Sequence, residues 1–128
     1  MSVREITLEW VAKAEEDAAV SERESRVRKQ PSPGAVCYHA QQCIEKYLKA
    51  VLQEQKRPIP KIHDLANLSE QCQFNPICLP VQRDGLVSLT RFATRFRYPG
   101  EAATGEDAKL AIALMRRYRA ALREFLRL

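Results

Sequence analysis

The sequence has few of the residues that interrupt regular structure and no long apolar run. Four of its 128 residues are glycine, one is tryptophan and two are histidine, whereas 45% are hydrophobic and 29% are charged. This composition argues against a loop-rich, fibrous or disordered chain. Because no apolar window is long enough for a membrane helix and the N-terminus has no signal-peptide pattern, we expect a cytoplasmic protein. The length suits one domain over residues 1–128.

The sequence also lacks the motifs of several common sites. It has no glycine-rich phosphate loop, no paired carboxylates, and no serine or cysteine nucleophile beside a credible base. Its four cysteines form no C-x-x-C pair and only two histidines could complete a metal site, so we expect neither a metal nor a cofactor. Cys43 falls on an apolar helical stripe and is expected to be a buried, reduced thiol. The other cysteines are Cys37, Cys72 and Cys78.

Positive charge is in excess. The chain has 21 lysines and arginines against 16 aspartates and glutamates, which gives a net charge of +5. This balance favours a polyanionic partner such as RNA, a nucleotide or an acidic protein, although charge alone specifies neither a fold nor a ligand.

Apolar residues recur at three- and four-residue steps in five segments, which is the pattern of amphipathic helices. No segment alternates with period two over the length of a strand, and no internal repeat is present. The sequence therefore predicts an all-α fold, an up-down four-helix bundle with one additional short helix. The predicted helices span about residues 3–26, 36–55, 63–72, 81–96 and 104–128.

Prolines and one capping pattern mark the ends of these helices. Pro58 and Pro60 cannot continue the second helix. Thr104, followed three residues later by Asp107, forms a capping box that starts the last helix. Gly85, inside the fourth helix, costs that helix about 1 kcal/mol relative to alanine. Further prolines precede the second and the fourth helix at Pro31, Pro33, Pro76 and Pro80.

Three sequence elements occur in order along the predicted helices. They are "AEEDAAV" in the first helix, "YHAQQCIEKYLKAVL" in the second with "IPKIHDL" after it, and "RFRYPGE" before the last helix. Each element is weak alone, but the combination is specific. Together they resemble the HEPN domain family, small helical domains named for higher eukaryotes and prokaryotes nucleotide-binding, from about Thr7 to Arg123.

The resemblance implies a four- or five-helix bundle that is commonly a homodimer. Bacterial and archaeal members are often encoded beside a minimal nucleotidyltransferase, in pairs regarded as toxin–antitoxin or nucleotide-handling modules. Some members are metal-independent ribonucleases that use an arginine and a histidine four to six residues apart near a helix end.

In this sequence only Arg57 and His63 have the ribonuclease spacing, and they are the catalytic candidates. Pro58 and Pro60 lie between them, so the pair lacks the helical register that would direct both side chains towards one phosphate. His63 has a structural alternative, because it is suited to a place just before a helix whose first free N–H groups are accepted by Asp64.

The segment "TRFRYPGEA" ends the fourth helix with basic and aromatic side chains. Arg91 and Arg95 share a helix face, while Arg97 and Tyr98 come where the helix must end before a proline. Guanidinium groups bind phosphate and an aromatic ring stacks on a base, so these four residues are candidates for binding a nucleotide or RNA. In the alternative interpretation, Phe96 and Tyr98 complete the core while the arginines cap the helix.

Charged residues of the first two helices form a second candidate group. Asp17 lies on the edge of an apolar stripe, where a bare carboxylate is costly to bury, so it needs a cation from Lys46, Lys49 or Arg95. The result is either a structural ion pair or a carboxylate that organises a ligand site. Lys49 also forms an ordinary surface pair with Glu45, four residues before it. The polar stripe of the second helix comprises Tyr38, Gln42, Glu45 and Lys49, with Lys46 beside it. Lys46 and Lys49 are also candidates for binding a nucleotide or RNA.

The last helix carries four arginines at steps of three, four and four, which places them in one narrow sector. A polyanion could follow this secondary basic stripe. The alternative is a solvated basic face that complements the negative end of the helix dipole. The stripe comprises Arg116, Arg119, Arg123 and Arg127.

Three functions are compatible with these patterns. The first, which we favour, is a nucleotide- or RNA-binding module that partners a nucleotidyltransferase-type protein as a homodimer. The second is a metal-independent endoribonuclease toxin. The third is a structural dimerisation module with an apolar surface that includes Trp10 or Phe92. The nucleotidyltransferase and the nucleotide ligand are implied by the resemblance alone.

Overall fold

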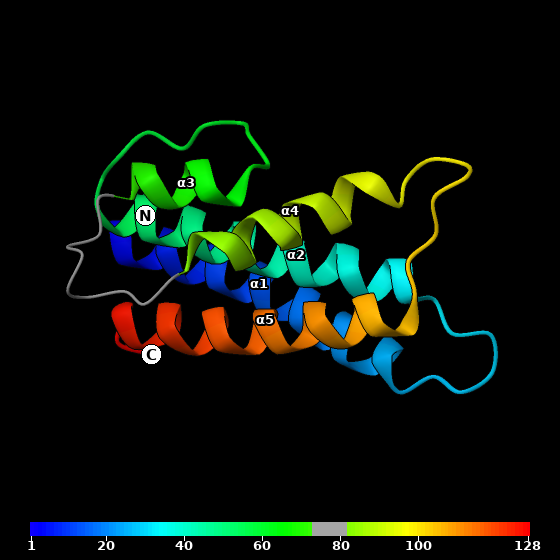
Figure 1. Ribbon diagram of the computed structural model, residues 1–128. Helices are drawn as coiled ribbons and strands as arrows, with labels where there is room; N and C mark the ends of the chain where they lie inside the picture. Colours follow the sequence, from blue (N-terminus) through cyan, green and yellow to red (C-terminus); the bar gives the residue numbers. More distant parts are fainter. Residues whose placement is uncertain (73–81) are drawn as a thin grey trace.

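The computed structural model describes residues 1–72 and 82–128, and every regular element in these ranges is a helix (Figure 1). The prediction of an all-α protein with one short extra helix is therefore confirmed for these ranges. The expected helix start at Val81, together with Pro76, Pro80 and Cys78, lies outside the described residues. The helices are α1 (Val3–Ser25), α2 (Pro33–Glu54), α3 (Leu65–Gln71), α4 (Arg83–Arg95) and α5 (Gly105–Phe125).

Side-chain caps fix where α3 and α5 begin. The carboxylate of Asp64 accepts a hydrogen bond from the backbone N–H of Asn67 at 3.1 Å, which starts α3 and leaves His63 just outside it. The hydroxyl of Thr104 accepts from the N–H of Asp107 at 3.1 Å, and the Asp107 carboxylate accepts from the N–H of Thr104 at 2.9 Å. The predicted capping box is thus confirmed.

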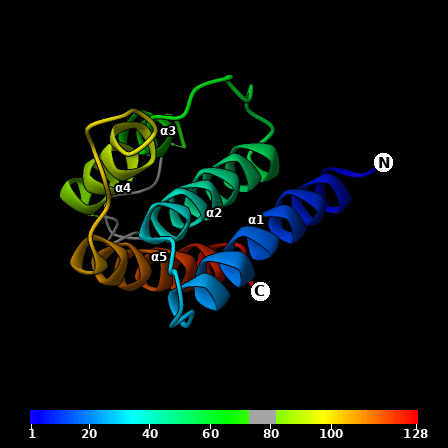
Figure 2. The same ribbon diagram turned by 90° about the vertical axis from the view of Figure 1, so that its right-hand side faces the viewer.

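The second helix, α2, is the centre of the fold. It packs against α1, α3, α4 and α5, whereas α1 and α4 lie on either side of it and make no contact within the described part of the chain (Figure 2). Thirteen of the 22 residues of α2 are buried, so polar side chains on this helix are enclosed together with the apolar ones. Cys43 is fully buried, as predicted. The largest buried side chains include Ile44, Tyr47, Leu48 and Leu52 of α2, Leu86 and Leu89 of α4, and Met115, Tyr118 and Leu122 of α5.

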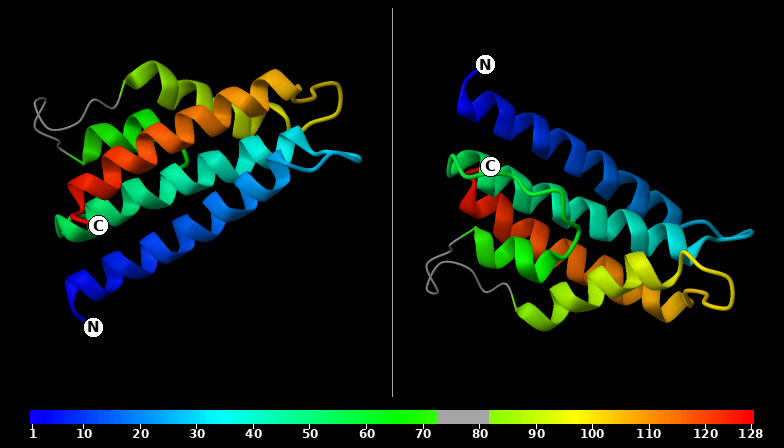
Figure 3. Two further views of the ribbon diagram at one scale, coloured as in Figure 1. Left: turned by 90° about the horizontal axis from the view of Figure 1, so that it is seen from below. Right: turned by 90° about the horizontal axis from the view of Figure 1, so that it is seen from above.

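Two connections meet at one end of the molecule. The segment between α1 and α2 and the segment between α4 and α5 lie there, whereas both chain termini lie at the opposite end (Figure 3). The α4–α5 connection includes Tyr98 and the positive-φ residue Gly100, where the left-handed backbone favours glycine. The basic, aromatic segment that ends α4 is therefore carried by an end of the helix array, next to the start of α2.

Candidate functional site

Three polar residues spaced one helical turn apart are buried on α2. They are Gln41, Glu45 and Lys49, each less than a tenth exposed. The sequence pattern suggested an ordinary surface pair for Glu45 and Lys49, and this expectation is wrong. Because α2 is surrounded by the other helices, the pair is enclosed, with side chains only 5% and 9% exposed. Enclosed charges need partners, and the Lys49 ammonium and the Glu45 carboxylate are partners of each other.

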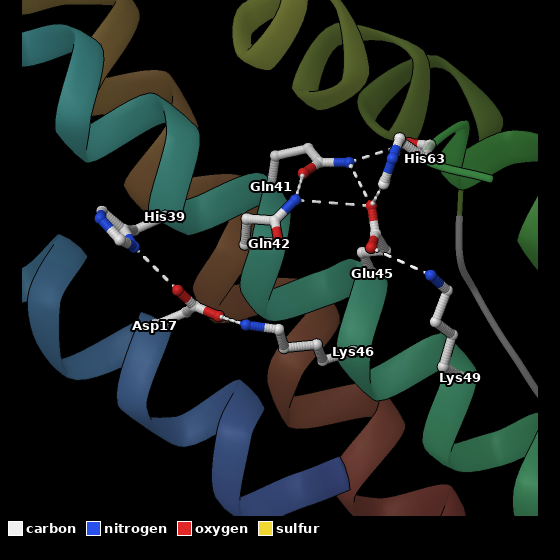
Figure 4. Close-up of polar contacts among 8 residues, drawn as sticks. All are labelled: Asp17, His39, Gln41, Gln42, Glu45, Lys46, Lys49 and His63. Atoms are coloured by element: carbon white, nitrogen blue, oxygen red, sulfur yellow. Dashed lines mark hydrogen bonds and ion pairs between the residues drawn. The ribbon is translucent and has the colours of Figure 1, made fainter. Parts of the chain in front are cut away.

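Glu45 is the acceptor around which these side chains are arranged (Figure 4). Its Oε1 lies 2.8 Å from Nδ1 of His63 and accepts from Nε2 of Gln41 at 3.3 Å, while its Oε2 accepts from Nζ of Lys49 at 3.1 Å. Gln41 also donates to the backbone carbonyl of His63 at 2.9 Å. Nε2 of Gln42 in turn donates to Oε1 of Gln41 at 2.8 Å. The network ties the residue before α3 to the middle of α2.

One ring nitrogen of His63 contacts Glu45, while the other is left for solvent or a ligand. Because Glu45 also receives the Lys49 ammonium, its oxygens act as acceptors, and Nδ1 of His63 is assigned as the donor. The side chain of His63 is nevertheless 72% exposed. Its Nε2 is therefore the nitrogen that remains to contact solvent or a ligand.

Asp17 organises a second, similar group of side chains. Its Oδ1 lies 2.8 Å from Nδ1 of His39, and its Oδ2 accepts a hydrogen bond from Nζ of Lys46 (Figure 4). The cation expected beside Asp17 is thus Lys46. The other two cations considered for Asp17 are paired elsewhere, Lys49 with Glu45 and Arg95 with Glu101.

A small cleft of about 100 Å³ opens beside the Glu45 network. Tyr38 of α2 and Arg97, just beyond α4, face each other there, with the guanidinium carbon 5.9 Å from the centre of the tyrosine ring. This distance is within the range of a cation–π contact. The edge of the cleft thus carries a cation and an aromatic ring. Its lining comprises Tyr38, Gln41, Gln42, His63, Ala93, Thr94 and Arg97.

The segment that ends α4 combines packing with exposure. Phe96 is half-buried and stacks on Phe92, with ring centroids 5.9 Å apart. Tyr98, in contrast, is 67% exposed, so it does not complete the core. Arg91 and Arg97 are exposed, and Nε of Arg95 donates to Glu101 at 2.9 Å. Phe96 therefore packs against the core as the structural interpretation expects, whereas Tyr98 does not, and ligand binding by the four candidate residues stays a prediction.

The arginines of α5 lie against acidic residues of α1. Nε of Arg119 donates to Glu15 at 2.7 Å, Arg123 contacts the same carboxylate at 2.8 Å, and Nε of Arg116 donates to Glu22 at 2.7 Å. The hydrogen bond from Arg119 lowers the pKa of Glu15 below the usual glutamate range, and the hydrogen bond from Arg116 does the same to the pKa of Glu22.

These ion pairs show that the basic stripe has a structural role in holding α5 against α1. Three members of the stripe join α5 to α1 through Glu15 and Glu22, so two carboxylates offset part of their positive charge, and a role in binding a polyanion stays a prediction. The fourth member, Arg127, does not share their sector. The helix ends at Phe125, and Arg127 has a left-handed φ of 59°, so the expectation of one continuous stripe of four is wrong.

Arg57 and His63 are held by different partners. The backbone N–H of Arg57 donates to the carbonyl of Leu52 at 2.9 Å and closes the end of α2, while the ring of His63 contacts Glu45. Within residues 1–72 and 82–128, no hydrogen bond or ion pair joins Arg57 to His63. A joint catalytic role stays a prediction. Trp10 and Phe92, named for an apolar dimer surface, are both half-buried and pack against the core.

Neither a membrane segment nor a metal centre is evident in the described part of the chain. No helix there is long and apolar enough to cross a membrane. No group of three or more histidine, cysteine, aspartate or glutamate side chains is arranged there to hold a metal ion.

Comparison with protein families matches residues 7–125 to the HEPN domain, which is nearly the whole chain. The chain belongs to the HEPN domain family. The Asp17 and Glu45 networks both lie inside the matched range of this HEPN domain. Searches of curated proteins and of solved structures gave no match.

Sequence reasoning missed several members of the site in this HEPN domain. No arginine precedes His39 at the ribonuclease spacing, so the sequence pattern gives it no role, yet it contacts Asp17. Gln41 was not considered, and Glu45 was placed on the surface. The signal that could have found them is the breadth of the apolar stripe of α2. A helix that is apolar on most sides is central, and its polar residues must then be buried and paired.

Proposed function

We propose that this HEPN domain is a non-catalytic nucleotide- or RNA-binding module that partners a minimal nucleotidyltransferase in a two-gene, toxin–antitoxin-like system. In this proposal it is a cytoplasmic homodimer and a single domain built as an up-down four-helix bundle. The observation that carries the proposal is the placement of Arg97 over the ring of Tyr38, at a cleft that also exposes His63. The partner and the genetic setting rest on family resemblance.

The chemistry of the cleft suits a phosphate beside a planar base. Arg97 is exposed and can bind phosphate oxygens in a bidentate manner. Tyr38 and the exposed Tyr98 offer rings on which a base stacks without regard to sequence. Arg91 and Arg95 extend positive charge along α4, and the pair of Arg95 with Glu101 is exposed enough to exchange for phosphate.

Lys46 and Lys49 support this site indirectly. Their ammonium groups are occupied by Asp17 and Glu45, so they balance the buried carboxylates that hold His39 and His63 in place. This arrangement agrees with the proposal that Asp17 organises a site rather than contacting the ligand.

The test is a titration of purified protein with a labelled, short single-stranded RNA at two salt concentrations, with each mixture also run on a denaturing gel. We expect binding that weakens at higher salt, because phosphate contacts release counterions, and an RNA that stays intact. Absence of binding at both salt concentrations would contradict the proposal.

A second candidate function is a metal-independent endoribonuclease, and the observation that favours it is the pairing of His63 with Glu45. A buried carboxylate that orients an exposed imidazole is the arrangement used for proton transfer in many active sites. The matched variants His63→Ala and His39→Ala decide between the two functions. Cleavage in the presence of EDTA that is lost only in His63→Ala would establish the ribonuclease.

A further inference from the structure

A second hollow, of about 450 Å³, is lined by residues from the end of α1, the α1–α2 connection, the start of α2 and the first part of α5. Val36 of α2 and Ile112 of α5 are its most deeply buried lining residues. Val27 and Pro31 contribute from the α1–α2 connection and Ala113 from α5. The walls are mainly apolar, and the volume falls within the range of about 300–1,000 Å³ that is typical of ligand pockets.

Cations surround this hollow. Arg28 and Lys29 are exposed and belong to the connection that contributes the lining residues Val27 and Pro31. Lys109 lines it from α5, and its contact with Glu106 is a 3.5 Å pair of two highly exposed side chains, which is weak. Counted over the lining and the residues near it in the chain, the cations include Arg26, Arg28, Lys29, Lys109 and Arg116, against the carboxylates Glu22, Glu24, Glu106 and Asp107.

The four local carboxylates are already engaged. Asp107 accepts a hydrogen bond from the backbone N–H of Thr104 at 2.9 Å, and Glu106 contacts Lys109. Glu22 is shared between Arg116 and Arg26. Glu24 accepts a hydrogen bond from the backbone N–H of Ser32 at 3.0 Å, which holds the start of α2. The surroundings of the hollow therefore keep a net positive charge around apolar walls.

We propose that this hollow is a docking site for an acidic peptide segment of a partner protein, with an apolar side chain inserted in the hollow and flanking carboxylates on the cations. Protein interfaces of this kind place an apolar anchor in a pocket and a polar rim around it. The charge of the rim selects an acidic segment and increases its rate of association. Among the residues that the structure describes, the hollow shares no lining residue with the cleft beside Tyr38, so this docking site does not depend on the nucleotide proposal.

The shape and lining of the hollow favour a peptide over other polyanions. Among residues 1–72 and 82–128, no aromatic residue lines it, so these residues offer no platform on which a nucleic-acid base would stack. Its walls form a hollow, whereas a helix that binds a membrane surface presents projecting apolar side chains to the lipid. A leucine or phenylalanine side chain of a peptide, in contrast, fills such a space.

The probe is a phage-displayed library of random 12-residue peptides, selected on the wild-type protein. Two exposed alanines of α5 supply matched variants with the same charge change, Ala113→Glu in the hollow and Ala120→Glu outside it. We expect the selected peptides to carry apolar residues flanked by aspartate or glutamate. Their binding should weaken at least about tenfold in Ala113→Glu, as for the loss of an anchor pocket, and stay unchanged in Ala120→Glu.

A second variant tests the same proposal if Ala113→Glu fails to fold. Arg28→Ser combined with Lys29→Ser changes only exposed residues of the connection and should weaken the same peptides. The proposal is overturned if no peptide is selected, if the selected peptides lack acidic residues, or if Ala113→Glu binds them as well as Ala120→Glu does. It is also overturned if Ala113→Glu instead abolishes self-association or binding to phosphatidylserine vesicles, because the occupant is then a second copy or a membrane.

Discussion

Gly85 of α4 lies directly against Tyr118 of α5. A Cβ atom at position 85 would be 1.9 Å from the Tyr118 hydroxyl oxygen and 2.8 Å from Cδ2 of Leu114. The same hydroxyl donates a hydrogen bond to the carbonyl of Gln82 at 2.8 Å, at the start of α4. The glycine that appeared in the sequence only as a cost to helix propensity is therefore required by the close approach of α4 to α5.

Replacing Gly85 with alanine should destabilise the protein by about 1–3 kcal/mol, because the new methyl group overlaps the fully buried Tyr118. Gly34→Ala is the matched control, since nothing lies within 4 Å of a Cβ there, and it should be neutral or slightly stabilising. Thermal and urea unfolding measure both. Gly85→Ala should cost less in a Tyr118→Phe background, where the clashing oxygen is absent, and equal costs in the two backgrounds would contradict the assigned contact.

Removing Glu45 should be far more damaging than removing the whole ion pair. Glu45→Ala leaves the Lys49 ammonium buried without its carboxylate and frees the ring of His63, so we expect a loss of about 3–5 kcal/mol. The double variant Glu45→Leu with Lys49→Met replaces the pair by apolar side chains and should lose much less. Urea unfolding of the single and double variants measures the coupling. Additive losses would show that the pair is exposed to solvent rather than enclosed.

The Glu15–Arg119 pair should make stability depend on pH in acid. The hydrogen bond from Arg119 lowers the pKa of Glu15 in the folded protein below its unfolded value of about 4.3. The carboxylate therefore contributes stability that is fully present above that value and is lost as pH falls through the folded pKa. The difference in unfolding free energy between wild type and Glu15→Gln should be constant from pH 7 to about 5 and shrink below about pH 4.

Glu16→Gln is the matched control for this pH series, because Glu16 is exposed on the same helix. The difference in unfolding free energy between Glu16→Gln and wild type should be small at every pH of the series. If the difference in unfolding free energy between wild type and Glu15→Gln grew as the pH falls, the predicted loss of this stabilisation in acid would be contradicted.

The buried thiols should be unreactive until the protein unfolds. Burial raises the pKa of Cys37 to about 11 and that of Cys72 to about 12, and it also raises the pKa of Cys43. Few thiolates exist at pH 8, and the sulfurs are enclosed. In a Cys78→Ser background, a disulfide reagent such as Ellman's should therefore label the three thiols only as denaturant unfolds the protein. Rapid labelling of the native protein would contradict their burial.

The helices could be predicted from the sequence because local rules determine them. Pro58 and Pro60 end the second helix, and Thr104 with Asp107 starts the last one, so these boundaries follow from neighbouring residues. The motifs "AEEDAAV", "IEKYLKA" and "RYP" identified the family for the same reason.

The site was harder to predict because it depends on which helix is central. Whether Glu45 is enclosed or solvated is decided by α1, α3 and α4 around it, and periodicity within one helix cannot show this. The arginines of α5 likewise face α1, an arrangement fixed by packing between segments about 100 residues apart. Tertiary contacts of this kind are absent from any local pattern.

The most direct test of the central claim compares two single arginine variants in RNA binding. Arg97→Ala removes the guanidinium over Tyr38, while Arg117→Ala removes an equally exposed charge on α5 that lies outside the cleft. We predict that fluorescence anisotropy with a labelled single-stranded RNA shows roughly tenfold weaker binding for Arg97→Ala, with Tyr98→Ala also weakened and with melting temperatures unchanged. Equal affinities for Arg97→Ala and Arg117→Ala would contradict the cleft as the nucleotide site.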